Sequence, residues 1–138
     1  MLKNLVAWII LFICVFPTTA KTPVQQVTEV KVEPSKDENI QFARLIARKE
    51  GISEELFIRI LLDESSGSST VIGDMNIICK KGPNKGKPVR ARGLFQITEC
   101  HWPKITDEQA FNPVWSTLWA AERFKEGRID IWTTVFRK

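Results

Sequence analysis

The stretch from Ser53 to Ser69 constrains this chain more than any other. Ser53 and the two glutamates after it form an N-cap with acids in the first turn, where the helix dipole favours negative charge. The following LFIRILLDE is apolar at most positions, which is typical of a buried helix. The run Ser-Ser-Gly-Ser-Ser then ends it, because these residues favour loops. We therefore expect a buried central helix that closes on Glu64.

Glu64 needs an explanation at the end of such a helix. Burying a carboxylate without a partner is unfavourable, so the group either pairs or holds its proton. A protonated acid beside a loop of small residues is what glycosidic-bond cleavage requires of a proton donor. The alternative is a solvent-facing glutamate in a helix-ending loop.

Length and charge limit the other possibilities. With 138 residues, one domain is expected, and a Rossmann domain or TIM barrel is excluded. The 20 Lys and Arg against 16 Asp and Glu give a net charge of +4, too mild an excess to indicate nucleic acid without a clustered basic face. We expect a monomer with no cofactor, no metal and no nucleic-acid partner.

The N-terminus has the pattern of a secretory signal peptide over residues 1–20. Lys3 precedes an apolar run from Leu5 to Phe16, and small residues up to Ala20 offer a cleavage site. The run is about twelve residues, whereas a membrane span needs roughly 20; an uncleaved anchor is the alternative, and either would be the protein's membrane contact. We expect a flexible linker over 21–36, a folded domain over 37–138, and export to the periplasm or the cell exterior.

Helix signals dominate the domain. Ser35 and Glu38 form a capping box that opens a first helix ending at Gly51. Thr106 opens another box, and Asn112–Pro113 starts a helix that continues to Gly127. The fold class is therefore mainly α, or α+β, with a loop or short hairpin inserted over 71–92.

The inserted segment is basic, contains Cys79 and precedes Cys100. It carries six cations and no acid after position 79, so it is either a solvated surface or a lip for an anionic polymer; these are Lys80, Lys81, Lys85, Lys87, Arg90 and Arg92. Cys79 and Cys100 are expected to form a disulfide in an exported chain. A metal site or a cysteine peptidase using His101 has less support, because His101 adjoins Cys100 and no CxxC spacing is present.

Glu64-Ser65-Ser66-Gly67 followed by Gly93-Leu94-Phe95-Gln96-Ile97 resembles the paired signatures of SLT-type lytic transglycosylases, relatives of goose-type lysozyme. The segments 110–113 (Ala-Phe-Asn-Pro) and 130–132 (Asp-Ile-Trp) continue the resemblance in the same order. It implies a lysozyme-like fold that binds peptidoglycan glycan strands. It also implies cleavage of the β-1,4 bond between N-acetylmuramic acid and N-acetylglucosamine, leaving a 1,6-anhydro end.

By this resemblance Glu64 is the catalytic acid and then the base. The expected substrate-binding residues are Ser65, Gly93, Phe95, Gln96, Trp132 and Phe136. For Phe95 and Ile97, packing in the core is the stronger expectation, whereas Gln96 is expected in the groove because a lone amide needs hydrogen bonds.

Two alternatives stay open. A muramidase would hydrolyse the same bond with a second carboxylate. Asp74 in the loop is the better candidate, because Asp63 points about 100° away from Glu64 around the helix. A wall-binding module without turnover is the other alternative. The family often has a Tyr-Asn pair where Phe136–Arg137 stands, and this chain contains no Tyr.

Overall fold

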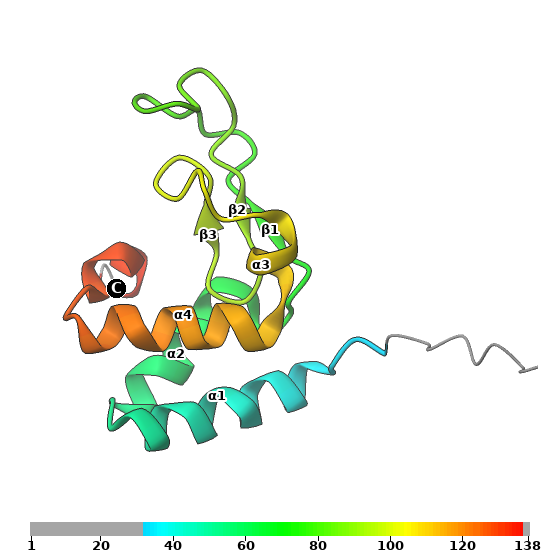
Figure 1. Ribbon diagram of the computed structural model, residues 1–138, viewed down its shortest axis with the longest axis vertical. Helices are drawn as coiled ribbons and strands as arrows, with labels where there is room; N and C mark the ends of the chain where they lie inside the picture. The colour runs from blue at the N-terminus through cyan, green and yellow to red at the C-terminus, as the bar shows by residue number, and fades with distance from the viewer. Residues whose placement is uncertain (1–31, 137–138) are drawn as a thin grey trace, which may run out of the picture. The chain divides into compact units, whose positions relative to one another are not determined.

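The computed structural model describes residues 32–136, with side chains as far as Trp132. The chain divides into two units, Met1–Lys31 and Val32–Lys138, and the following concerns the second. The expected signal peptide (1–20) and most of the expected linker lie outside the described residues. The elements in order are α1 (Lys36–Glu50), α2 (Glu54–Ser65), β1 (Ile72–Gly73), β2 (Ala91–Arg92), β3 (Ile97–Thr98), α3 (Asp107–Phe111), α4 (Pro113–Lys125) and the 3₁₀ segment η1 (Ile129–Phe136) (Figure 1).

Helix ends lie where the capping residues place them. The side chain of Ser35 accepts from the backbone of Glu38, whose carboxylate accepts from Ser35 in return, so the predicted capping box is confirmed. α1 thus begins at Lys36, and the last residue of the expected linker belongs to the helix. Gly51 ends α1 in the left-handed conformation, and Ser53 caps α2.

The central helix is less enclosed than its composition suggests. Phe57, Ile60 and Leu61 of α2 are fully buried, but Leu62 is 42% exposed and Asp63 also faces solvent. The prediction of a helix apolar and buried nearly all round is therefore wrong for one face. α2 is an amphipathic helix with a wide apolar side.

The inserted segment and the residues that follow it form a small antiparallel sheet in the order β1-β2-β3. Gly73 pairs with Ala91, and Arg92 pairs with Ile97. Residues 75–89, called here the arm, connect β1 to β2 and extend away from the helices (Figure 1). With the sheet beside the helices, the fold is α+β.

The core lies between the helices and the turn that joins β2 to β3. Phe57 contacts Phe95 and Phe124 at ring-centroid distances of 4.9 and 5.0 Å. Trp132 of η1 closes the cluster 5.9 Å from Phe95 and 5.4 Å from Phe124. Within residues 32–136, no helix is both long and apolar enough to cross a bilayer.

Candidate functional site

Glu64 is the penultimate residue of α2 and is half-buried. Its neighbour Ser65 is buried: the Ser65 hydroxyl donates to the Leu61 carbonyl at 3.1 Å and accepts from the Gly67 N–H at 3.3 Å. The Gly67 carbonyl in turn accepts from the Asn39 side chain of α1 at 3.0 Å. The backbone that follows Glu64 is thereby held against α1, and the Ser65 hydroxyl makes its hydrogen bonds within this turn.

Gln96 stands in the turn between β2 and β3 and is fixed on two sides. Its amide nitrogen donates to the carbonyls of Gly93 at 2.9 Å and Val71 at 3.3 Å. Gly73 leaves room for its amide oxygen, since a Cβ on that glycine would lie 2.5 Å from the oxygen. Gln96 is half-buried, so its predicted hydrogen bonding is present and is made with the protein.

Gly93 and Phe95 are both closely packed against other parts of the domain. A Cβ on Gly93 would lie 2.1 Å from the Ala110 carbonyl oxygen of α3, and Gly93 has φ +71°. Phe95 and Ile97 are buried in the core, as the packing expectation predicted. The Phe95 carbonyl accepts from the Trp132 indole at 3.0 Å. Trp132 is 4% exposed, so its side chain presents little surface to a substrate.

A groove of about 520 Å³ lies beside this turn. Gln96 and Thr98 line it from the sheet side, Trp119 lines it from α4, and Asp130 and Trp132 line it from η1. The other lining residues are Phe95, Ile97, His101, Trp102, Arg128 and Ile131. The side chain of Phe136, the remaining expected site residue, lies outside the described part.

Tryptophans in the groove are held edge to face. Trp119 lies 5.1 Å from Trp102 and 6.2 Å from Trp132, both at steep angles. The Arg123 guanidinium carbon lies 5.9 and 5.8 Å from the Trp102 and Trp119 rings, within cation–π range. Half-buried indoles fixed in this way offer apolar faces to a ligand.

Sequence reasoning missed Trp102, Trp119, Thr98 and His101 as lining residues. Trp119 was expected on a helix, but nothing in its spacing distinguishes a groove-lining indole from a core one. The available signal was the unusual number of five Trp in a short chain, which suits either a dense core or a stacking groove and locates neither.

The two candidate second carboxylates differ in position. Asp63 is exposed, with its carboxylate 4.0 Å from Arg59. Asp74 follows β1 directly, with φ 56°, and its predecessor Gly73 contacts Gln96. Asp74 therefore lies in the loop, as expected, and it is the first residue after the strand, where pairing of Gly73 with Ala91 ends.

Two of the six cations in the basic segment are not available to a ligand. Arg92 is 1% exposed and contacts Asp107 at 2.8 Å; Arg90 pairs with Asp107 at 2.6 Å and with Glu99. Hydrogen bonds from Arg90 and Arg92 hold the pKa of Asp107 well below its ordinary value. The expectation of a six-cation lip is therefore corrected to four lysines on the arm.

The Cys79–Cys100 disulfide is present, with Cα atoms 5.6 Å apart, as the sequence predicts. It joins the arm to the segment that follows β3. No group of three or more His, Cys, Asp or Glu side chains in residues 32–136 is arranged to hold a metal ion.

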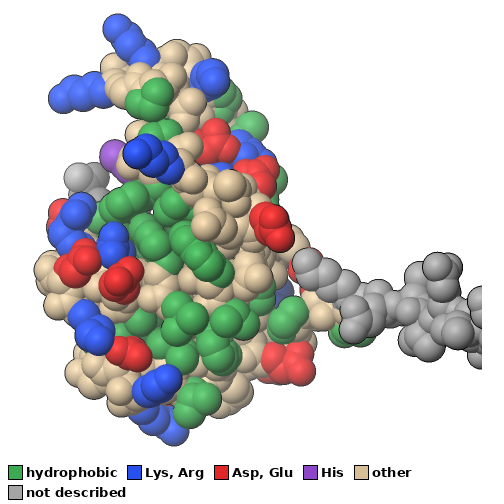
Figure 2. All heavy atoms as spheres, viewed as in Figure 1, with side chains coloured by type: hydrophobic (Ala, Val, Ile, Leu, Met, Phe, Trp, Pro, Cys, Tyr) green, Lys and Arg blue, Asp and Glu red, His purple; other side chains and the backbone are tan. Residues whose placement is uncertain are grey.

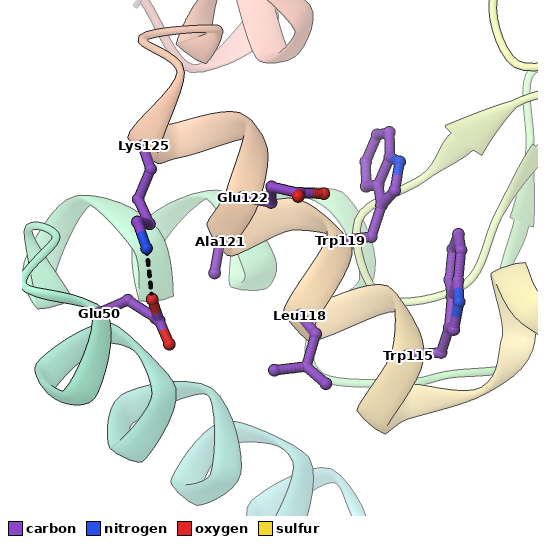
Figure 3. Close-up of a pocket in the computed structure, with 7 residues that line it drawn as sticks. All are labelled: Glu50, Trp115, Leu118, Trp119, Ala121, Glu122 and Lys125. Atoms are coloured by element: carbon purple, nitrogen blue, oxygen red, sulfur yellow. Dashed lines mark hydrogen bonds and ion pairs between the residues drawn. The ribbon is translucent and has the colours of Figure 1, made fainter.

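A second hollow, of about 410 Å³, opens between α1 and α4. Figure 3 shows Leu118 and Ala121 pointing from α4 toward α1, and the Lys125 ammonium group lies 2.7 Å from the Glu50 carboxylate across the gap. It contains none of the site residues expected from the sequence. The groove beside Gln96 is therefore the better candidate site.

No protein-family model matches this chain, and no curated protein or solved structure matches it at the significance required. The case for a function depends on the residues and their geometry.

Proposed function

We propose that this chain is an exported lytic transglycosylase with a lysozyme-like arrangement. It would cleave the β-1,4 bond between N-acetylmuramic acid and N-acetylglucosamine in peptidoglycan. The supporting observation is the fixed position of Gln96. Its amide binds the carbonyl of Val71, seven residues after Glu64, and its side chain also lines the tryptophan groove. The turn that contains Gln96 therefore contacts the segment that follows Glu64 and also lines the groove.

In this proposal the glycan strand lies along the groove with a sugar face against Trp102 or Trp119. Glu64 donates its proton to the glycosidic oxygen as that bond breaks. The resulting carboxylate then accepts the proton of the C6 hydroxyl of the muramoyl sugar, as that oxygen bonds to C1. Ring closure within one bound sugar benefits from proximity, so a single carboxylate is sufficient.

The decisive variant is Glu64→Gln, which keeps the side-chain shape but cannot deliver a proton. We expect release of soluble fragments from purified peptidoglycan to fall at least about 100-fold, the usual contribution of a general acid. Asp63→Asn is the matched control, since it removes a neighbouring exposed carboxylate and should keep the activity. Circular dichroism of both variants establishes that the fold is unchanged. Glu64→Gln at the wild-type rate would contradict the proposal.

The position of Asp74 gives a second candidate, a muramidase. Asp74 is exposed, and it directly follows Gly73, the glycine that contacts Gln96. A hydrolase would release reducing muramic ends that carry oxygen from labelled water, whereas a transglycosylase releases fragments one water lighter without label. Mass spectrometry of the products separates the two, and absence of any product leaves a binding module.

A further inference from the structure

The arm is a cationic projection with free charges. Lys80, Lys81, Lys85 and Lys87 are all exposed, and residues 75–89 contain no acid. None of the four ammonium groups forms an ion pair with another residue in the described part of the chain. Figure 2 shows blue side chains at the outer end of this projection, away from the mixed charges that cover the helices.

Apolar side chains accompany these lysines. Met75, Ile77 and Ile78 are each about half exposed, at 50, 52 and 48%. Ile77 and Ile78 also line a hollow of about 500 Å³, together with Val89 and the disulfide cysteines. Three neighbouring large apolar residues in water, on a segment outside the core, indicate a contact surface.

The arm is braced in this shape. The Cys79 N–H donates to the Lys87 carbonyl at 2.9 Å, and the Val89 N–H donates to the Ile77 carbonyl at 2.7 Å. The disulfide fastens the same hairpin to Cys100. Because the hairpin is already ordered, little conformational entropy is lost when it binds.

We propose that the arm docks on the surface of an anionic lipid bilayer. The lysines would lie over the lipid phosphates, and Met75, Ile77 and Ile78 would enter the interface between headgroups and acyl chains. An anionic wall polymer would match the ammonium groups but would leave the three apolar side chains in water. The arm also has no aromatic residue on which nucleic-acid bases could stack. This contact is separate from the N-terminal apolar run and does not depend on the proposed activity.

The test is hydrogen–deuterium exchange of the full chain, with and without vesicles of phosphatidylglycerol and phosphatidylcholine. Exchange is read for each peptide, so protection of residues 75–89 is distinguished from any contact of the N-terminal run. We expect anionic vesicles to slow exchange in the arm and vesicles of pure phosphatidylcholine to leave the exchange rate unchanged. Each lysine near such a surface strengthens binding about fivefold.

Matched variants separate charge from apolar contact. One variant changes Lys80, Lys81 and Lys85 together to Gln. We expect it to raise the concentration of anionic vesicles that gives half-maximal protection of the arm at least about tenfold. The same change at Lys36, Lys49 and Lys104, which are also exposed, should leave it unaltered.

A second pair of variants tests the apolar contact. Met75→Gln with Ile77→Gln should also weaken protection, and Leu45→Gln, at an exposed leucine of α1, should not.

The outcomes that overturn the proposal are equally specific. Protection of the arm by purified peptidoglycan but not by vesicles would identify a wall contact instead. Equal protection by neutral and anionic vesicles would refute the role of the lysines. No protection by either material would leave the arm as a solvated surface.

Discussion

Replacing Gly93 with alanine tests the packing of the site turn, and Gly51 provides a control with the same backbone. Both glycines are left-handed, with φ +71° and +68°. A Cβ on Gly51 meets nothing within 4 Å, whereas one on Gly93 would lie 2.1 Å from the Ala110 carbonyl oxygen and 3.3 Å from that of Ser69. Both substitutions therefore place alanine in the left-handed conformation, and only Gly93→Ala adds a steric overlap with neighbouring atoms.

The magnitudes follow from that difference. The left-handed conformation costs alanine about 1 kcal/mol in each variant. Overlap with a backbone that cannot rotate away adds about 3 kcal/mol at Gly93 alone, the upper end of overpacking penalties. At about 4 °C per kcal/mol for a domain of this size, Gly51→Ala lowers Tm by about 4 °C and Gly93→Ala by about 16 °C.

Thermal unfolding followed by circular dichroism measures both. Equal losses of Tm in the two variants would refute the overlap argument. A Gly93→Ala variant of normal stability with weakened peptidoglycan binding would instead assign Gly93 to substrate contact, as the resemblance implies.

Three further outcomes are expected. Asp74→Asn leaves the rate and the anhydro product unchanged; loss of activity in assays with labelled water would identify the second carboxylate of a hydrolase. Reducing the disulfide, which joins residues 21 apart, lowers the free energy of unfolding by about 3 kcal/mol in urea titrations with and without dithiothreitol. Hydrogen bonds from Arg48 and Arg44 lower the pKa of Glu54 from 4.5 to about 2, so its stabilising effect is full above pH 4.5 and is lost as pH falls toward 2. Glu54→Gln should flatten the acid unfolding profile in that range, and an unchanged profile would contradict this.

Local signals in the sequence located the helices well. The boxes at Ser35 and Thr106 and the cap at Asn112 each satisfy backbone groups within three residues, so the sequence around them contains the whole interaction. The strands were not resolved in the same way. With two residues each, β1, β2 and β3 are too short for alternation of apolar and polar residues to be visible.

The candidate site was predicted less completely, because its geometry depends on distant partners. Arg92 has the same charge as the lysines before it in the chain, but it is buried against Asp107, fifteen residues later. Trp132 lines the groove and also packs on Phe95 and Phe124, far from it in the sequence or on another helix. The groove contribution of Trp119 arises only when α4 and η1 come together. The spacing of residues along the chain does not predict any of these contacts.

The arm enters and leaves the domain through adjacent residues, since Gly73 and Ala91 are partners in the sheet. Apart from the disulfide cysteine, the described side chains between them lie outside the buried interior. A tight turn of two residues could therefore join Gly73 to Ala91 directly, and arms of other lengths could be inserted at the same point. An arm of another length would leave the packing of α1, α2 and α4 as it is, whereas the groove residues His101 and Trp102 adjoin Cys100, which the disulfide ties to this arm.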